Sequence, residues 1–189
     1  MTKRVAAALL AAAFLSAASG TAGAAPGYSA DPQQSRLEFV GMQAGAEFKG
    51  AFRKFTAAIE FAPGDLATSR FDVQIDLNSV DTMDRDRDTA IRGRDIFDVA
   101  HFPAGHYVTR SFTRTATGYA AVGALTLRGV TKDVPIDFMF TESPAGAKLE
   151  GIAKLKRLDF GAGQGDWKST DQIADTVKIN FSLVLKPKT

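Results

Sequence analysis

The segment Gly123-Ala124-Leu125-Thr126-Leu127-Arg128-Gly129-Val130-Thr131-Lys132 has the form of a tight turn between two β-strands. The stretch before it, Tyr119 to Leu127, is rich in β-prone residues, and after it apolar residues recur at every second position: Val134, Ile136, Phe138 and Phe140. A period of two places such side chains on one face of a strand. Gly129 stands where the chain must reverse, and glycine reaches positive φ at no steric cost. The segment therefore predicts a β-hairpin with one buried face.

The same alternation runs through most of the chain on both sides of this hairpin. We expect further strands at Ser35 to Gln43, Ala46 to Lys54, Phe55 to Phe61, Arg70 to Val80, Gly105 to Phe112, Ala147 to Lys156 and Asp175 to Leu185. In the clearest of them, Phe71, Val73, Ile75 and Leu77 alternate with polar residues, which is typical of an antiparallel sheet with one dry face. Eight or nine short strands separated by turns favour an all-β sandwich or barrel.

The stretch from Asp81 to Phe102 interrupts the strand pattern. Its charged start predicts a short helix from about Asp84 to Arg92, followed by a loop. Three aspartates at alternate positions resemble the start of a calcium-binding loop. The EF-hand pattern needs Gly at its sixth position and Glu at its twelfth, where this chain has Thr89 and Asp95. We therefore favour a solvated charged helix and expect no metal site.

The N-terminus has the three regions of a secretory signal peptide. Lys3 and Arg4 precede an apolar run from Val5 to Leu15, and small residues follow from Ser16 to Ala25. An uncleaved membrane anchor is the alternative, but spanning a bilayer takes about 20 apolar residues, more than this run supplies. We expect residues 1–24 to be a cleaved signal peptide and residues 25–189 to form one exported domain.

Composition excludes several classes of function. The chain of 189 residues has no cysteine, so a disulfide, a thiol nucleophile and a cysteine metal site are all excluded. Without Lys3 and Arg4, 21 of the 23 basic residues remain against 21 acidic ones, and this formal neutrality does not indicate a nucleic-acid partner.

No catalytic motif is recognisable. His101 and His106 lie five positions apart, unlike the usual zinc sets, so we interpret them as structural or surface residues. No GxSxG elbow occurs. The glycine-rich stretch from Gly161 to Gly165 lacks the GK[ST] ending of a phosphate loop, and we expect a flexible turn there. The sequence thus predicts neither an enzyme nor a cofactor.

Phenylalanine is abundant, and many of the 14 phenylalanines fall on the dry faces of the expected strands. Two interpretations remain open from the pattern alone. The rings fill a solid core, as in many small barrels, or they line a lipid cavity inside a hollow barrel that the stretch from Asp81 to Phe102 closes.

Several motifs, in the same order, resemble those of the YceI-like family. They cover nearly the whole chain after the leader: Ser35-Arg36-Leu37-Glu38-Phe39, Gly45, Gly50-x-Phe52-x-x-Phe55, Ser79-Val80-Asp81-Thr82, Arg87-Asp88, Asp95-Ile96-Phe97-Asp98, Phe102-Pro103, the hairpin from Gly123 to Lys132, and Arg157-x-Asp159-Phe160-Gly161. Ile96 stands where many members have Trp, and Tyr107 and Thr109 replace a common Phe and Ser.

The resemblance implies an extended, lipocalin-like antiparallel β-barrel of about eight strands in the bacterial periplasm. It implies an internal tunnel that holds a polyisoprenoid, an isoprenoid quinone or another long-chain lipid, with no metal, cofactor or catalytic activity. The resemblance is compatible with transient membrane contact. It is also compatible with either a monomer or a homodimer. An accessory or stress-response protein that acts through a membrane redox partner is the alternative.

From the dry faces and the resemblance together we predict the lining of this tunnel. The predicted residues are Phe39, Phe52, Phe55, Phe71, Val73, Ile75, Leu77, Phe97, Phe102, Tyr107, Ile136, Phe138, Trp167, Ile179 and Phe181.

Overall fold

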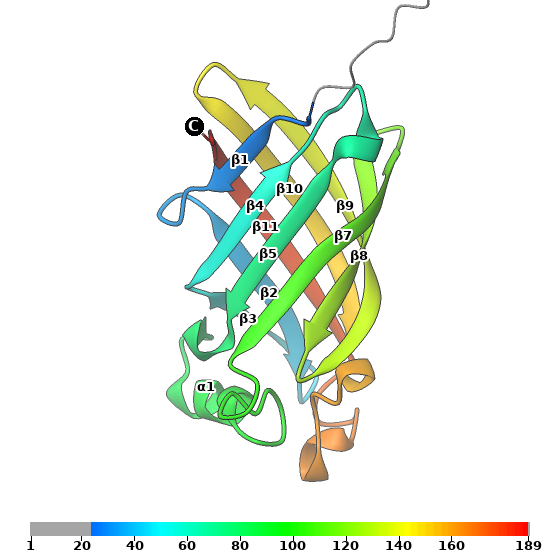
Figure 1. The fold of residues 1–189 in the computed structure, drawn as a ribbon. Helices are drawn as coiled ribbons and strands as arrows, with labels where there is room; N and C mark the ends of the chain where they lie inside the picture. Colours follow the sequence, from blue (N-terminus) through cyan, green and yellow to red (C-terminus); the bar gives the residue numbers. More distant parts are fainter. Residues whose placement is uncertain (1–23, 189) are drawn as a thin grey trace, which may run out of the picture.

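Strands dominate the computed structural model, which describes residues 24–188 (Figure 1). The expected leader therefore lies almost entirely outside the described residues. The strands are β1 (Gly27–Ala30), β2 (Arg36–Gln43), β3 (Ala46–Phe52), β4 (Phe55–Glu60), β5 (Arg70–Asp76), β6 (Val80–Asp81), β7 (Ala104–Arg114), β8 (Tyr119–Leu127), β9 (Val130–Ser143), β10 (Gly146–Lys156) and β11 (Thr176–Pro187). One α-helix, α1 (Arg85–Arg92), and the 3₁₀ turns η1 (Leu66–Thr68), η2 (Leu77–Ser79), η3 (Arg157–Phe160) and η4 (Gly165–Lys168) connect them.

Six of the strands combine in pairs into three long, interrupted strands. β1 and β2 both pair with β11, β4 pairs with β1, and β3 pairs with β2. β5 then pairs with β4, and β6 pairs with β3. Counted in this way, eight antiparallel strands each pair with the next along the chain, and β11 returns to β1 and β2 to close the barrel. The prediction of a barrel of about eight strands is confirmed.

Polar side chains bridge the interruptions. Between β1 and β2, the carboxylate of Asp31 accepts hydrogen bonds from the Gln33 N–H and the Gln34 amide and pairs with Lys186 at 2.6 Å. The breaks after β3 and β5 lie side by side, because the backbone N–H of Lys54 donates to the Ser79 hydroxyl at 2.9 Å. The barrel wall is therefore continuous although three of its strands are not.

The predicted hairpin around Gly129 forms between β8 and β9. Leu127 pairs with Val130, and the two residues between them, Arg128 and Gly129, have φ of 50° and 74°. Positive φ at both central positions is the geometry of a type I′ turn, whose twist matches that of the flanking strands.

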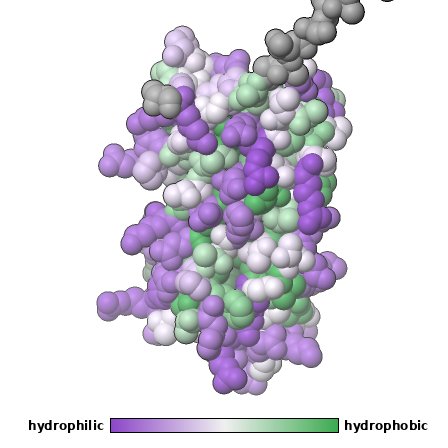
Figure 2. All heavy atoms as spheres, viewed as in Figure 1, coloured by the Kyte–Doolittle hydropathy of each residue, from purple (hydrophilic) through white to green (hydrophobic). Residues whose placement is uncertain are grey.

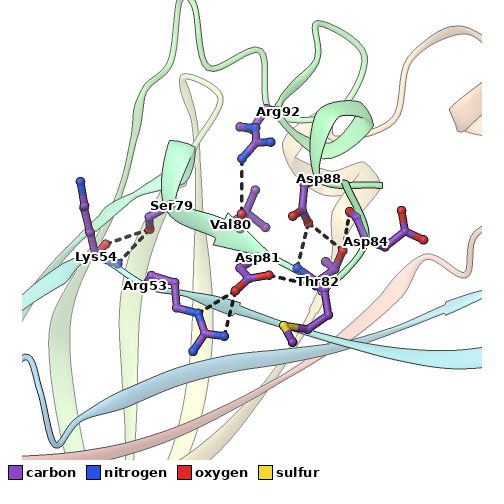
Figure 3. A network of polar contacts seen from close by, with 10 residues as sticks. Arg53, Lys54, Ser79, Val80, Asp81, Thr82, Asp84, Asp88 and Arg92 are labelled. Carbon is purple, nitrogen blue, oxygen red and sulfur yellow. Dashed lines mark hydrogen bonds and ion pairs between the residues drawn. The ribbon is translucent and has the colours of Figure 1, made fainter. Parts of the chain in front are cut away.

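The charged insertion folds as the expected helix, and two of its aspartates have separate structural partners. Asp84 caps α1, because its carboxylate accepts from the N–H groups of Asp86 and Arg87. The buried Asp88 accepts instead from the N–H and the hydroxyl of Thr82, at 2.8 and 2.7 Å (Figure 3). These bonds fix the start of the helix against the end of β6.

Aromatic rings fill the barrel at the end opposite α1, the upper end in Figure 1. Phe61 is fully buried, and the centroids of five rings lie 4.8–5.8 Å from its own: Phe71, Phe112, Tyr119, Phe138 and Phe140. Tilted and edge-to-face arrangements of this kind are favourable for aromatic rings. The upper end of the barrel is therefore occupied by packed rings.

Hydrophilic side chains are spread over much of the outer wall on the face shown in Figure 2. They alternate with the core residues along the strands, as the period of two requires. None of the helices between residues 24 and 188 is both long enough and apolar enough to cross a membrane.

Candidate functional site

A cavity of about 590 Å³ occupies the barrel interior below the aromatic cluster. Phe71 and Ile59 lie at its inner end, and residues of α1 and of the segment after β10 lie around its other end. Binding sites for small molecules have volumes of roughly 300–1,000 Å³. The cavity therefore has the size of a ligand site. Its other end, here called the mouth, is lined by the exposed Asp84 and Asp86 and lies beside α1, at the lower end of the barrel in Figure 1.

The lining is almost entirely apolar. Five of its side chains carry an amide or a charge: Gln43, Asp84, Asp86, Arg87 and Arg157. The first four lie at the mouth, on the end of β2 and on or beside α1. Apart from the phenol of Tyr107 and the indole of Trp167, the remaining lining is aliphatic, phenylalanine or glycine. Such a surface favours a hydrocarbon over a polar solute.

The structure places twelve of the fifteen predicted residues around this cavity. They are Phe39, Phe52, Phe71, Val73, Ile75, Leu77, Phe97, Tyr107, Ile136, Trp167, Ile179 and Phe181.

The other three, Phe55, Phe102 and Phe138, do not line the cavity. Phe138 faces inward but belongs to the aromatic cluster, where its ring lies 5.5 Å from that of Tyr119. The ring of Phe102 packs against Gly129 of the hairpin turn. Phe55 begins β4 beside the break in the third long strand and packs on the core without reaching the cavity.

Several lining residues were missed by the prediction. They include Leu37, Phe48, Ile59, Leu125, Leu127, Val134, Leu149, Leu155, Phe160, Val177 and Leu183, together with Ile91 and Ile96 of the insertion. Most of them lie in phase with residues that were predicted, so the period of two could have found them. The periodicity did not indicate Arg157, although one of the motifs shared with the YceI-like family, Arg157-x-Asp159-Phe160-Gly161, contains it.

Glycine makes room for the rings along the cavity wall. Gly50 lies opposite Phe39 in the β2–β3 pairing, and Gly151 lies opposite Phe181 in the β10–β11 pairing. A Cβ atom at either glycine would overlap the ring across from it. The absent side chains let both rings lie flat over the strand, which leaves the space inside the barrel open.

Arg87 is held in place at the mouth. Its guanidinium lies 4.6 Å from the ring centroid of Phe48, bonds to the side-chain oxygen of Gln43 at 3.3 Å, and is 3.4 Å from the Asp84 carboxylate. Asp86, one residue before it, is exposed. The mouth thus presents both signs of charge.

Arg157 is buried at the lower end, and its donors go to backbone carbonyls. The guanidinium bonds to the carbonyl oxygens of Ala162, Trp167, Ser169, Ile173 and Ala174, at 2.7–3.3 Å. Burial lowers the pKa of this guanidinium, and the nearby carboxylate of Asp175 opposes the shift. The side chain organises the segment between β10 and β11.

The glycine-rich stretch within this segment is not the flexible turn that the sequence predicted. The N–H groups of Gly163 and Gln164 both donate to the Asp95 carbonyl at 2.8 Å, and the N–H of Ala162 donates to the Arg157 carbonyl. With those amides already bonded, the stretch does not offer the free N–H groups of a phosphate loop. It instead ties the segment after β10 to the loop after α1.

Neither histidine lies at the cavity. His101 bonds to Asp98 and His106 bonds to Asp72, and none of the four lines the cavity. The hydroxyl of Tyr107 donates to the Val134 carbonyl at 3.1 Å, and burial raises the pKa of this phenol. Between residues 24 and 188 no three acidic or histidine side chains gather where they could hold a metal ion.

Comparison with known proteins fits this geometry. The YceI-like domain matches residues 28–185. The chain belongs to the YceI-like domain family. The crystal structure of BcnA from Burkholderia cenocepacia, which is 31% identical, superimposes with a TM-score of 0.77 over 82% of this chain and 98% of that one.

Two further relatives of this YceI-like protein differ from BcnA: one is matched over less of its length, and the other is less similar in sequence. A UPF0312 protein from Yersinia pestis is 33% identical over 117 residues, which is 59% of this chain and 61% of the relative. A polyisoprenoid binding domain from Saccharophagus degradans, implicated in plant cell wall breakdown, is 19% identical with a TM-score of 0.63. That match covers 85% of this chain and 98% of the other, and it shows the shared fold.

Proposed function

We propose that this YceI-like protein binds a long-chain amphiphile, a polyisoprenoid or an isoprenoid quinone, inside the barrel. The observation that carries the proposal is the apolar cavity of about 590 Å³, whose charged and amide side chains all lie at its lower end. A fold of this kind also serves a domain described as polyisoprenoid binding. The proposal includes no catalytic step.

Hydrophobic transfer provides the binding free energy. Each buried CH₂ group contributes about 0.8 kcal/mol, so ten of them contribute roughly 8 kcal/mol before the cost of ordering the chain is subtracted. The site therefore needs few polar contacts for tight binding. It selects mainly for the length and width of the apolar chain.

The direction of binding follows from the two ends of the cavity. The aromatic cluster around Phe61 fills the upper end, whereas Gln43, Asp86 and Arg87 lie at the mouth. A polar head group keeps its hydrogen bonds only at the mouth, because burying it without partners costs free energy. The hydrocarbon tail accordingly points toward Phe71 and the head group toward α1.

We place this binding activity in the periplasm, where the protein sequesters or carries its lipid. The sequence features of residues 1–24 support export. An exported carrier must take up and release its ligand at a membrane, so we also expect transient membrane contact, by a monomer or a homodimer.

The test is to identify what the protein holds when it is made in its natural host. The protein is purified without detergent, extracted with organic solvent, and the extract is analysed by mass spectrometry. We expect an isoprenoid at close to one molecule per chain. An extract without any long-chain amphiphile, from protein that also fails to take up added geranylgeraniol, contradicts the proposal.

The alternative of an accessory protein without a ligand predicts a barrel filled throughout. The cavity between Phe71 and α1 favours the binding function instead.

A further inference from the structure

Residues 165–171, here called the flap, lie across the mouth of the cavity. The flap contains η4, and the side chain of Trp167 on it lines the cavity. The chain is anchored on both sides of the flap. The N–H groups of Gly163 and Gln164 bond to the Asp95 carbonyl at 2.8 Å, and the N–H of Ala174 bonds to the Met42 carbonyl at 3.1 Å.

Arg157 ties the flap itself to the barrel. Its guanidinium donates to the carbonyl oxygens of Trp167 at 2.7 Å and Ser169 at 3.3 Å. Within the part of the chain that the structure describes, these are the hydrogen bonds that join the flap to residues outside positions 164–171. Trp167 N–H and Asp171 N–H bond only to close neighbours, the Gln164 carbonyl and the Ser169 hydroxyl.

The local sequence accommodates this arginine. Gly163 has a φ of 137°, and a Cβ atom there would overlap a terminal nitrogen of the guanidinium. Arg157 is 7% exposed, and its bonds all go to carbonyl oxygens instead of a carboxylate. A buried cation is tolerated only when its donors are fully used, so the five carbonyl bonds hold the side chain and the segment together.

We propose that Arg157 is a positioning residue that holds the flap closed and thereby sets the rate at which a ligand leaves the cavity. This inference rests on the proposed function. The aromatic cluster around Phe61 fills the other end, so a ligand passes between α1 and the flap. Lifting the backbone of the flap away from the mouth breaks the two bonds from Arg157. Hydrogen bonds from a charged donor are the strong ones.

The test compares Arg157→Lys with the wild type and with Arg114→Lys. Lysine keeps the charge but lacks the planar fork of donors. Arg114 also donates to a backbone carbonyl, that of Pro63, at the far end of the barrel. Each protein is loaded with all-trans-geranylgeraniol and mixed with excess phosphatidylcholine vesicles, and the alcohol left on the protein is followed by mass spectrometry. We expect release to be about tenfold faster or more in Arg157→Lys and unchanged in Arg114→Lys.

A second readout follows the flap directly, because Trp167 is the single tryptophan of the chain. We expect acrylamide to quench its fluorescence more strongly in Arg157→Lys, even without ligand. Trp167→Ala, which leaves the backbone carbonyls in place, should also speed release, and it serves if Arg157→Lys does not fold. Wild-type release from both variants overturns the inference. If the wild type takes up no alcohol, the proposed function fails, and unchanged quenching in folded Arg157→Lys overturns the flap inference separately.

Discussion

Gly50 shows how one missing side chain shapes the cavity. It lies across from Phe39, and a Cβ atom there would overlap that ring and lie 2.9 Å from the methyl group of Thr82. We predict that Gly50→Ala lowers the free energy of unfolding by about 1–3 kcal/mol, the usual cost of overpacking. Gly64→Ala is the matched control, because nothing lies within 4 Å of its Cβ position. Equal urea midpoints for the two variants would contradict this account of the wall.

Asp31 makes the stability of the folded barrel depend on pH. A hydrogen bond from Lys186, followed by one from the Gln33 N–H, holds the pKa of the Asp31 carboxyl below its usual 3.8. Since the folded pKa is the lower one, the carboxylate stabilises the folded state above pH 3.8, and this stabilisation is lost as the pH falls through the lowered pKa. Asp31→Asn should therefore reduce the unfolding midpoint at about pH 7, with a difference that shrinks below pH 3.8. A difference that stays constant at low pH would refute the assignment.

For a single residue, the sequence predicts which face of the strand it occupies but not its depth along the barrel. The period of two correctly turned both Ile136 and Phe138 inward, yet only Ile136 reaches the cavity, because Phe138 lies among the rings of the upper end. Depth depends on the tilt and pairing of the strands, and a local pattern carries neither. The position of Arg157 at the cavity was not predicted either. Its acceptors are backbone carbonyl groups, which every residue has, so the sequence does not show which residues they belong to.

Among the elements, α1 depends on its cap. Asp84 accepts from two N–H groups of the first turn, which otherwise have no partner within the helix. Asp84→Ala should lower the free energy of unfolding by about 0.5–2 kcal/mol, whereas Asp84→Ser should retain most of the stability because serine also caps well. Thermal unfolding of both variants checks this prediction. A Ser variant as unstable as the Ala variant would show that the cap does not fix the helix.

The strand boundaries divide into those that periodicity predicts and those that it does not. Seven strands begin and end within two residues of the expected positions: β2, β3, β4, β7, β8, β10 and β11. The expected strand from Arg70 to Val80 is instead broken by η2. The apolar alternation continues through Leu77, but the backbone turns there, and the Ser79 hydroxyl accepts a hydrogen bond from the N–H of Lys54. β1 was not predicted, since four residues are too few to display a period.

For the whole molecule, the periodicity was equally compatible with a solid barrel and with a hollow one. The structure has a filled part and a hollow part. Rings around Phe61 fill the upper part, and the cavity of about 590 Å³ occupies the rest. Both parts use inward-facing phenylalanines, so composition could not separate them. The difference arises where glycines such as Gly50 let rings lie along the wall and where α1 and the flap cover the lower end.

Lipid uptake by Ile75→Trp tests most directly whether this cavity is the binding site. Ile75 lines the cavity, and its neighbour Gln74 is exposed on the outer face of the same strand, so Gln74→Trp introduces the same ring on the outside. Uptake of geranylgeraniol is measured with both folded variants, alongside their urea midpoints. The account predicts that Ile75→Trp loses most of the uptake with little loss of stability, because the new ring occupies empty space, and that Gln74→Trp binds like the wild type. Normal uptake by well-folded Ile75→Trp would contradict the central claim that the ligand lies inside the barrel.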